Sequence, residues 1–173
     1  PETWALQAEG PAGAEYFGIV FKMGTFMPHI PLKKLINRQD KNLPQAGNQS
    51  FWLNGAAWEY PTYENVDTFI NRLIHQDILK YDLVVKAMIE DKPMDLSLRT
   101  VQRRFVEATG ISYKTFQQIE RARLATALLL QGKPILDTAF EMGYYDQSHL
   151  TNALTRFMGQ TPAEIAKEIA TNA

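Results

Sequence analysis

The chain has 173 residues, no cysteine and a formal net charge of −1 at pH 7. The absence of cysteine excludes disulfide bonds and thiolate metal sites. Hydrophobic residues make up 45% and charged residues 21%, which is ordinary for a soluble globular protein. No apolar run approaches the ~20 residues that a membrane span requires, so we expect no membrane contact. The lack of cysteine fits a reducing cytoplasm, and we expect a cytoplasmic protein.

Charge is balanced along the chain. Residues 81–173 carry 11 Lys and Arg against 11 Asp and Glu. Nucleic-acid binders draw much of their affinity from neutralising phosphates, so this balance requires a local concentration of cations if the chain binds DNA. The stretch Arg99–Arg104 supplies one, with three arginines and no acid.

The first 80 residues predict a small irregular α+β segment. Aromatic and β-branched residues over Tyr16–Met23 predict one strand, and the composition of 42–49 predicts a loop. Apolar residues at helical spacing over Val66–Ile74 predict an amphipathic helix. Trp52 and Trp58 are expected to pack near that helix.

From residue 82 the pattern predicts helix after helix. A short helix, 82–89, is followed by one that Ser97 can cap and Gly110 can end. A longer helix over 113–131 begins after Ser112. The second half of this helix is apolar nearly all round, which indicates a buried connecting helix.

Two further helices, 134–142 and 146–158, flank the turn Gly143–Tyr145. Two helices joined by a short turn that contains glycine form a helix-turn-helix. The second helix of such a unit lies in the major groove, where each base pair presents its own donors and acceptors. A last helix is expected after Thr161, with Glu164 completing a capping box.

A helix that reads the groove needs polar side chains opposite its core stripe. Two helices have such a face, formed by Arg99, Thr100, Gln102, Arg103 and Arg104 in one and by Gln147, Ser148, Thr151, Asn152 and Thr155 in the other. Arg can bind guanine through two hydrogen bonds, and Gln or Asn can bind adenine in the same way. A solvated helix has the same pattern, so the residues alone leave both interpretations open.

Two stretches carry a more specific signal: LSLRTVQRRFVEATGIS and QIERARLATALLLQGKPILDTAFEMGYYDQSHLTNALTRFMGQTPAEI. The pattern in the second consists of Arg123, Ala127, Leu129-Leu130, Ile135, Asp137, Ala139, Gly143, Tyr144, Asp146–Leu150, Arg156, Phe157, Gly159, Thr161 and Pro162. Over about residues 82–170 the chain thereby resembles the DNA-binding domain of the AraC/XylS family of transcriptional regulators.

The resemblance implies a mainly α domain of seven helices, in which a long helix, 113–131, joins two helix-turn-helix subdomains. Their recognition helices would enter successive major grooves ~34 Å apart. The residues implied in DNA binding are Arg99, Thr100, Gln102 and Arg103 in the first recognition helix, and Gln147, Ser148, Thr151, Asn152 and Arg156 in the second. Arg99, Gln102, Arg103, Gln147, Ser148 and Asn152 would contact bases.

Two features depart from the family pattern. The family has a full positioning helix before the first recognition helix, whereas here the short segment between Ile89 and Ser97 contains Pro93 and three acids. The first helix-turn-helix is therefore expected to be degenerate or held differently. Asn152 and Thr155 stand where the family commonly has basic residues, which lowers the expected phosphate contact.

The N-terminal part resembles, less specifically, the end of a cupin-like regulatory domain, through GIVFKMGTFMPHIPL and FWLNGAAWEYPTYENVDTFINRLI. We expect the chain to start partway through such a domain. Residues 1–80 would be this partial regulatory segment and 82–173 the DNA-binding domain. Implied partners are double-stranded DNA, RNA polymerase, an unidentified small-molecule effector and a second copy of the chain, bound through the missing N-terminal part. The resemblance also implies a bacterial, nucleoid-associated protein.

No catalytic or metal site is predicted. The histidines His29, His75 and His149 lack metal-ligand spacing, and no cofactor motif is present. The sequence thus predicts a non-enzymatic, sequence-specific DNA-binding transcriptional regulator. The alternative is an effector-sensing or protein-interaction module that has lost specific DNA binding, which the balanced charge and the altered first unit favour.

Overall fold

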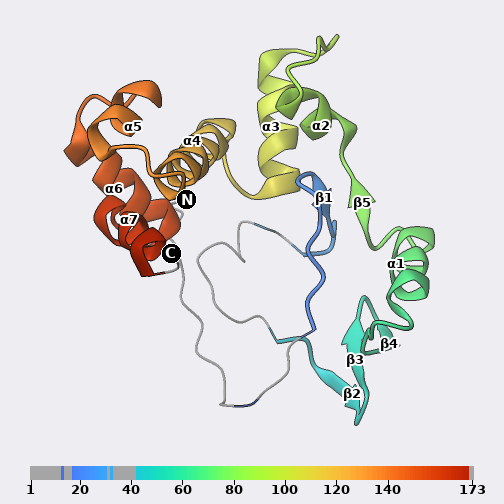
Figure 1. Ribbon diagram of the computed structural model, residues 1–173. Coiled ribbons are helices and arrows are strands. Elements are labelled where there is room, and N and C mark those ends of the chain that lie inside the picture. Colours follow the sequence, from blue (N-terminus) through green and yellow to red (C-terminus); the bar gives the residue numbers. More distant parts are fainter. Residues whose placement is uncertain (1–12, 14–16, 31, 33–41, 172–173) are drawn as a thin grey trace. The chain divides into compact units, whose positions relative to one another are not determined.

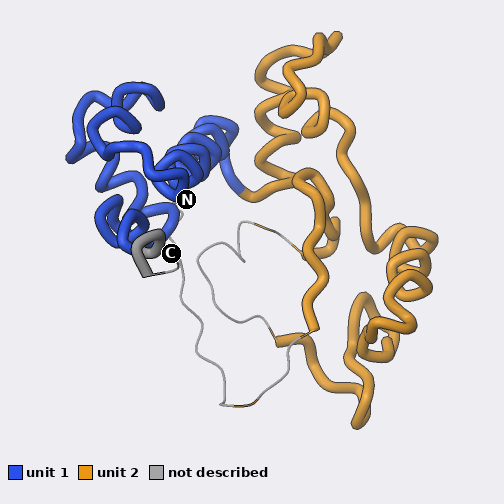
Figure 2. Tube along the Cα trace, in the orientation of Figure 1, with its two compact units in different colours: residues 1–8, 111–173 blue, residues 9–110 orange. Residues whose placement is uncertain are grey.

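The computed structural model describes residues 13, 17–30, 32 and 42–171 (Figure 1). These residues contain seven helices and five short strands, which confirms the predicted mainly α fold. They fall into two compact units, one ending at Gly110 and the other beginning at Ile111 (Figure 2). This break lies within the segment 82–173, which the sequence predicts to be one DNA-binding domain. The division into a regulatory segment, 1–80, and a DNA-binding domain, 82–173, stays a prediction.

The first unit contains a three-stranded antiparallel sheet of β2 (Gln45–Gly47), β3 (Ser50–Leu53) and β4 (Ala56–Glu59). The turn between β3 and β4 is Asn54-Gly55, with φ angles of 51° and 78°. A type I′ hairpin turn requires positive φ at both central residues, and Asn-Gly is its preferred dipeptide. The loop prediction for 42–49 is wrong in part, because β2 lies within it.

Trp58 is the centre of the small core that joins this sheet to helix α1 (Val66–His75). The side chain is 1% exposed, and its Nε1 donates a hydrogen bond to the Leu53 carbonyl at 3.1 Å. The Phe69 ring of α1 meets the indole edge to face, with centroids 5.7 Å apart. Trp58 thus packs against the helix as predicted, whereas Trp52 is 46% exposed.

A second antiparallel pair joins β1 (Thr25–Phe26) to β5 (Lys80–Tyr81). The strand prediction for 16–23 is wrong, since residues 17–22 form no strand and Tyr16 lies outside the described residues. Pairing begins only after Gly24, which has a φ of 94°, and a Cβ there would lie 3.1 Å from Val85. β-propensity is realised only where a partner strand is available, and β5 is short.

The helices α2 (Leu83–Ile89) and α3 (Leu98–Thr109) complete the first unit. Ser97 caps α3 by accepting a hydrogen bond from the Thr100 amide at 3.3 Å, and Gly110 ends the helix with a φ of 79°. The segment 90–97 forms no helix, as its composition predicts. The described residues from 82 onward therefore form six helices, where the resemblance implies seven.

The second unit consists of α4 (Tyr113–Leu130), α5 (Ile135–Glu141), α6 (Gln147–Met158) and α7 (Pro162–Thr171). Ser112 caps α4, with its Oγ 3.1 Å from the Thr115 amide. The predicted capping box opens α7: Thr161 and Glu164 exchange hydrogen bonds of 2.7 and 3.3 Å. These local signals were readable in the sequence because each requires only residues close along the chain.

Helix α4 is the packing support of the second unit, since it contacts α5, α6 and α7. Its buried residues are Ala122, Ala125 and Leu129, each 0% exposed. Leu124 and Leu130 are 47% and 45% exposed, so the prediction of a helix buried nearly all round is wrong in part. One face of α4 forms the core and the remainder is open to solvent.

Candidate nucleic-acid interface

Backbone hydrogen bonds shape the turn between α5 and α6. Gly143 has a φ of 69°, and its amide donates to the Phe140 carbonyl at 3.1 Å. The Tyr144 amide donates to the Ala139 carbonyl at 2.8 Å. Together these bonds form a Schellman motif, which ends α5. The motif directs the Tyr144 ring, 3% exposed, into the core and so fixes where α6 begins.

The first turn of α6 is held by its own side chains. Asp146 accepts a hydrogen bond from the His149 amide at 2.7 Å, as an N-cap residue does. His149 Nδ1 lies 3.4 Å from the Tyr145 amide, and its ring meets Tyr144 edge to face at 5.2 Å. Leu150, 0% exposed, anchors the opposite side of the helix in the core.

The face of α6 away from the core carries the predicted contacts. Four of the predicted residues are exposed there: Gln147, Ser148, Asn152 and Arg156. Thr151 is half-buried, and its hydroxyl donates to the Gln147 carbonyl at 2.9 Å. The Arg156 guanidinium lies 5.1 Å from the centroid of the Phe157 ring. The structure therefore brings the second predicted group together on one rigid helix.

Helix α3 carries the first predicted group. Three of its residues are exposed: Arg99, Gln102 and Arg103. Thr100 is half-buried, with its hydroxyl 2.9 Å from the Ser97 hydroxyl, so this side chain takes part in the helix cap. The two predicted groups lie in different compact units, and the distance between the recognition helices stays a prediction.

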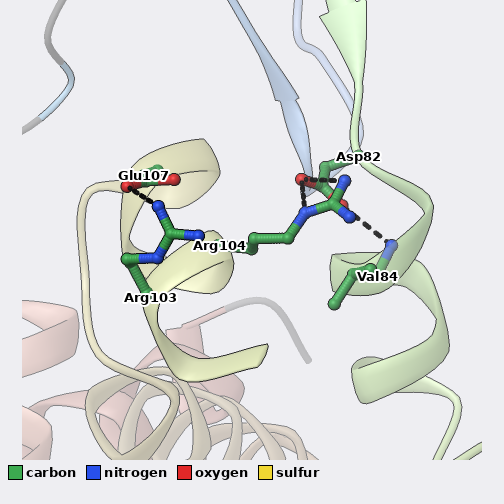
Figure 3. Close-up of polar contacts among 5 residues, drawn as sticks. All are labelled: Asp82, Val84, Arg103, Arg104 and Glu107. Carbon is green, nitrogen blue, oxygen red and sulfur yellow. Dashed lines mark hydrogen bonds and ion pairs between the residues drawn. The ribbon is translucent and has the colours of Figure 1, made fainter. Parts of the chain in front are cut away.

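Two of the three clustered arginines of α3 are paired with acids (Figure 3). Arg103 lies 3.3 Å from the exposed Glu107, one turn along the same helix. The Arg104 side chain forms hydrogen bonds of 2.9 and 3.0 Å to Asp82, which is 7% exposed. Since Asp82 also caps α2 through the Val84 amide at 2.8 Å, Arg104 ties α3 to α2.

These pairs reduce the local positive charge that the sequence predicted over Arg99–Arg104. Arg104 points toward α2, so its charge is directed at a protein carboxylate. Sequence reasoning missed Asp82 as the partner because the two residues are 22 apart along the chain. Of the two paired arginines, Arg103 is the more exposed, with 65% of its side chain exposed against 41% for Arg104.

The arginines of α4 differ in their surroundings. Arg123 forms hydrogen bonds to Glu120, the shortest 2.9 Å, which raise the pKa of its guanidinium. Arg121 instead lies over the Tyr144 ring, 4.7 Å from its centroid. Arg121 and Ala125 repeat the four-residue spacing of Arg123 and Ala127 two residues earlier in the chain. Ala125 is buried and Ala127 is exposed, so the earlier of the two alanines is the one that lies in the core.

Among the described residues, no group of three or more His, Cys, Asp or Glu side chains is placed to hold a metal ion. No helix in this part of the chain is long and apolar enough to cross a membrane. Helices α3 and α6 each have a polar face exposed to solvent, an N-terminal side-chain cap and buried residues on the opposite face.

Comparison with known proteins matches residues 92–168 to a family model described as a helix-turn-helix domain. The match covers α3 to α6 and most of α7. A comparison with solved structures gave no significant match.

Two curated proteins are similar to the chain, both named HTH-type transcriptional regulator RipA. The protein from Corynebacterium glutamicum is 35% identical over 68 residues, which is 39% of this chain and 20% of the relative. The protein from Corynebacterium diphtheriae is 29% identical over 93 residues, which is 53% of this chain and 28% of the relative. The matched segments thus span less than a third of either relative.

Proposed function

We propose that the chain is a DNA-binding transcriptional regulator that reads base edges in the major groove with α6. Residues 92–168, which match the helix-turn-helix family model, would form a DNA-binding domain of the AraC type. Helix α3 is the second, weaker reading element. The single observation that carries the proposal is the exposed polar face of α6, held by the cap of Asp146 and the turn at Gly143.

The side chains on this face suit base recognition. Gln147 and Asn152 carry carboxamides, which can donate to and accept from the edge of adenine at the same time. Ser148, between them, can donate or accept. Because none of these three carries a charge, their contribution depends on hydrogen-bond geometry and hence on sequence.

Helix α3 supports the proposal in a different way. Arg99 and Arg103 have the group that binds guanine or phosphate, and Gln102 has a carboxamide. Arg103 exchanges its contact with Glu107 for a contact with DNA, at the cost of one exposed ion pair that contributes ~0–1 kcal/mol. Reading by α3 is therefore expected to depend more strongly on salt than reading by α6.

The proposal is tested by selecting random-sequence duplex DNA on the full chain at two salt concentrations and sequencing the bound pool. Enrichment of a two-part motif, with parts about 10 base pairs apart, supports reading by both helices. Enrichment of one half-motif supports reading by α6 alone and overturns the role of α3. Binding without enrichment overturns sequence-specific reading altogether.

Matched variants assign the motif to α6. Gln147→Ala is expected to relax one base position of the motif. Gln131→Ala, which removes the same group from an exposed position at the end of α4, is expected to leave the motif unchanged. Equal effects of the two changes contradict the assignment.

The second candidate function is a protein-interaction or effector-sensing module. The ion pairs of Arg103 and Arg104, together with the balanced charge of the C-terminal half, favour it. Loss of all DNA binding at low salt, with a folded chain, is the outcome that selects this candidate. RNA polymerase, a small-molecule effector and a homodimer are partners that we propose from the family resemblance.

A further inference from the structure

A cleft of about 140 Å³ lies between α4 and α6, within the second compact unit. Its polar lining consists of Gln118 and Arg121 from α4 and His149, Asn152 and Arg156 from α6. A water molecule needs about 10–15 Å³ of such volume, so the cleft has room for several atoms of that size and can admit a small anion.

The charged residues that line the cleft are all positive. None of the described lining residues carries a carboxylate, whereas two of them are arginines. The nearest acid on α4, Glu120, is hydrogen-bonded to Arg123. On α6, Asp146 is occupied by the helix cap. An anion entering the cleft therefore meets two guanidinium groups without a competing carboxylate in the lining.

The two helices hold the cationic groups in place. The Arg121 guanidinium lies 4.7 Å from the centroid of the Tyr144 ring, and Tyr144 is fixed in the core by the turn that precedes α6. Burial raises the pKa of the Tyr144 phenol, and the positive charge of Arg121 opposes that rise. The His149 ring meets the Tyr144 ring edge to face at 5.2 Å, and its Nδ1 lies 3.4 Å from the Tyr145 amide.

The cleft is continuous with the reading face of α6, because Asn152 belongs to both. The next residues along the helix toward the cleft are Ala153 and Arg156. A duplex that places a base edge against Gln147 and Asn152 presents its backbone phosphates to the side of the helix. The anion in reach of the cleft is then a phosphodiester group.

We propose that this cleft binds one phosphate of the DNA backbone through Arg121 and Arg156, so that α4 is itself part of the DNA interface and positions α6 in the groove. The inference rests on the proposed function. It assigns a binding role to Arg121, which lies outside both groups of residues that the sequence implied in DNA binding.

The test compares Arg121→Gln with the matched control Arg123→Gln, which removes the same charge from the same helix. The slope of log K against log salt concentration is measured on the selected DNA. Arg121→Gln is expected to reduce the slope by about 0.9, the loss of one phosphate contact, and to leave the enriched motif unchanged. The control is expected to keep the wild-type slope. Equal slopes for wild type and Arg121→Gln overturn the proposal and leave the proposed function standing.

Ethylation interference keeps the proposal testable if Arg121→Gln is less stable. Ethylation of one backbone phosphate is expected to abolish binding of the wild-type chain and of Arg123→Gln, but to have little effect on Arg121→Gln. An identical interference pattern for all three proteins overturns the assignment. Saturation of the cleft by millimolar inorganic phosphate, seen by NMR at His149, with no change in interference, overturns it in favour of a free anion site. A wild-type chain that binds no DNA overturns both the proposed function and this inference.

Discussion

Helices α3 and α6 have the same scaffold and different chemistry. Each is 12 residues long, each begins with a side-chain cap, and each ends at a glycine with φ between 70° and 80°. The outer face of α3 carries arginines, of which Arg103 and Arg104 are paired with acids. The outer face of α6 carries uncharged side chains, with Arg156 in its last turn. The caps thus define where each helix begins. Under the proposed function, charged outer residues make DNA affinity depend on salt concentration, and uncharged ones make it depend on base sequence.

The support behind the two helices also differs. A Schellman turn at Gly143 joins α6 directly to α5, so the backbone itself sets the angle of the helix. The segment 90–97 before α3 has no helix, and the side-chain pair of Arg104 and Asp82 connects α3 to α2 instead. The connection of α3 to the preceding helix therefore depends on a side-chain ion pair, whereas that of α6 depends on backbone hydrogen bonds.

The largest expected effect concerns the core of α3. Phe105 is 0% exposed, so Phe105→Ala is expected to lower the free energy of unfolding by about 3–5 kcal/mol, measured by urea denaturation. Leu98→Ala, on the same helix at a site 68% exposed, is the control and is expected to change stability by less than about 0.5 kcal/mol. Equal losses would mean that α3 is not anchored through Phe105.

The connection between α3 and α2 is tested next. Arg104→Ala leaves the buried Asp82 without its guanidinium partner, which is expected to cost about 1–3 kcal/mol in the free energy of unfolding. Arg103→Ala, which breaks an exposed pair, is expected to cost about 0–1 kcal/mol. A loss of DNA affinity by Arg104→Ala at unchanged stability would instead make Arg104 a DNA contact.

The chemistry of α6 predicts an effect confined to one base position. Asn152→Ala is expected to reduce discrimination at that position by about 1–3 kcal/mol, measured by competition between duplexes that differ at single base pairs. Asn71→Ala, which removes the same group from an exposed position on α1, is the control. A uniform loss across all duplexes would show that Asn152 contacts the backbone only.

The acid on α3 offers a change that strengthens binding. Glu107→Gln removes the acid that Arg103 leaves on contacting DNA, so the ~0–1 kcal/mol cost of breaking this exposed ion pair disappears. The affinity for the selected DNA, measured by titration, is therefore expected to rise by up to about fivefold. Glu141→Gln, which breaks the pair with Lys133 in the second unit, serves as the comparison. Unchanged affinity in Glu107→Gln would remove Arg103 from the interface.

The smallest expected effect is on the acid stability of α7. Hydrogen bonds from the Thr161 amide and hydroxyl lower the pKa of Glu164. A carboxylate with a lowered folded-state pKa stabilises the fold above its unfolded pKa, and this contribution is lost as the pH falls through the folded value. The difference in melting temperature between wild type and Glu164→Gln is therefore expected to shrink from pH 7 toward pH 3. A constant difference would exclude the capping box as its source.

The helical part of the fold could be predicted because its signals are local. Ser97, Gly110, Ser112 and Thr161 each act within a few residues, and each element boundary they predict is confirmed within one or two residues. The sheet was missed although Asn54-Gly55, between two apolar runs, was a readable hairpin signal.

For the candidate site, the sequence could predict which residues share the exposed face of a helix, but not which residues contact them from other helices. Exposure of Gln147, Ser148 and Asn152 follows from the apolar stripe on the other side of α6. The partner of Arg104 could not be predicted, because the contact joins residues distant in sequence. The surroundings of Arg121 likewise depend on how α4 packs against the turn before α6.

Only the residues 110–112 separate α3 from α4. Four backbone steps from Thr109 to Tyr113 span at most about 14 Å, so the end of α3 cannot move far from the start of α4. If α3 and α6 both bind DNA as proposed, the helix that binds first holds the other at an effective concentration in the millimolar range. Under that proposal a helix with weak affinity of its own still contributes to binding, and cutting the chain at Gly110 is expected to cost more affinity than the loss of any single contact.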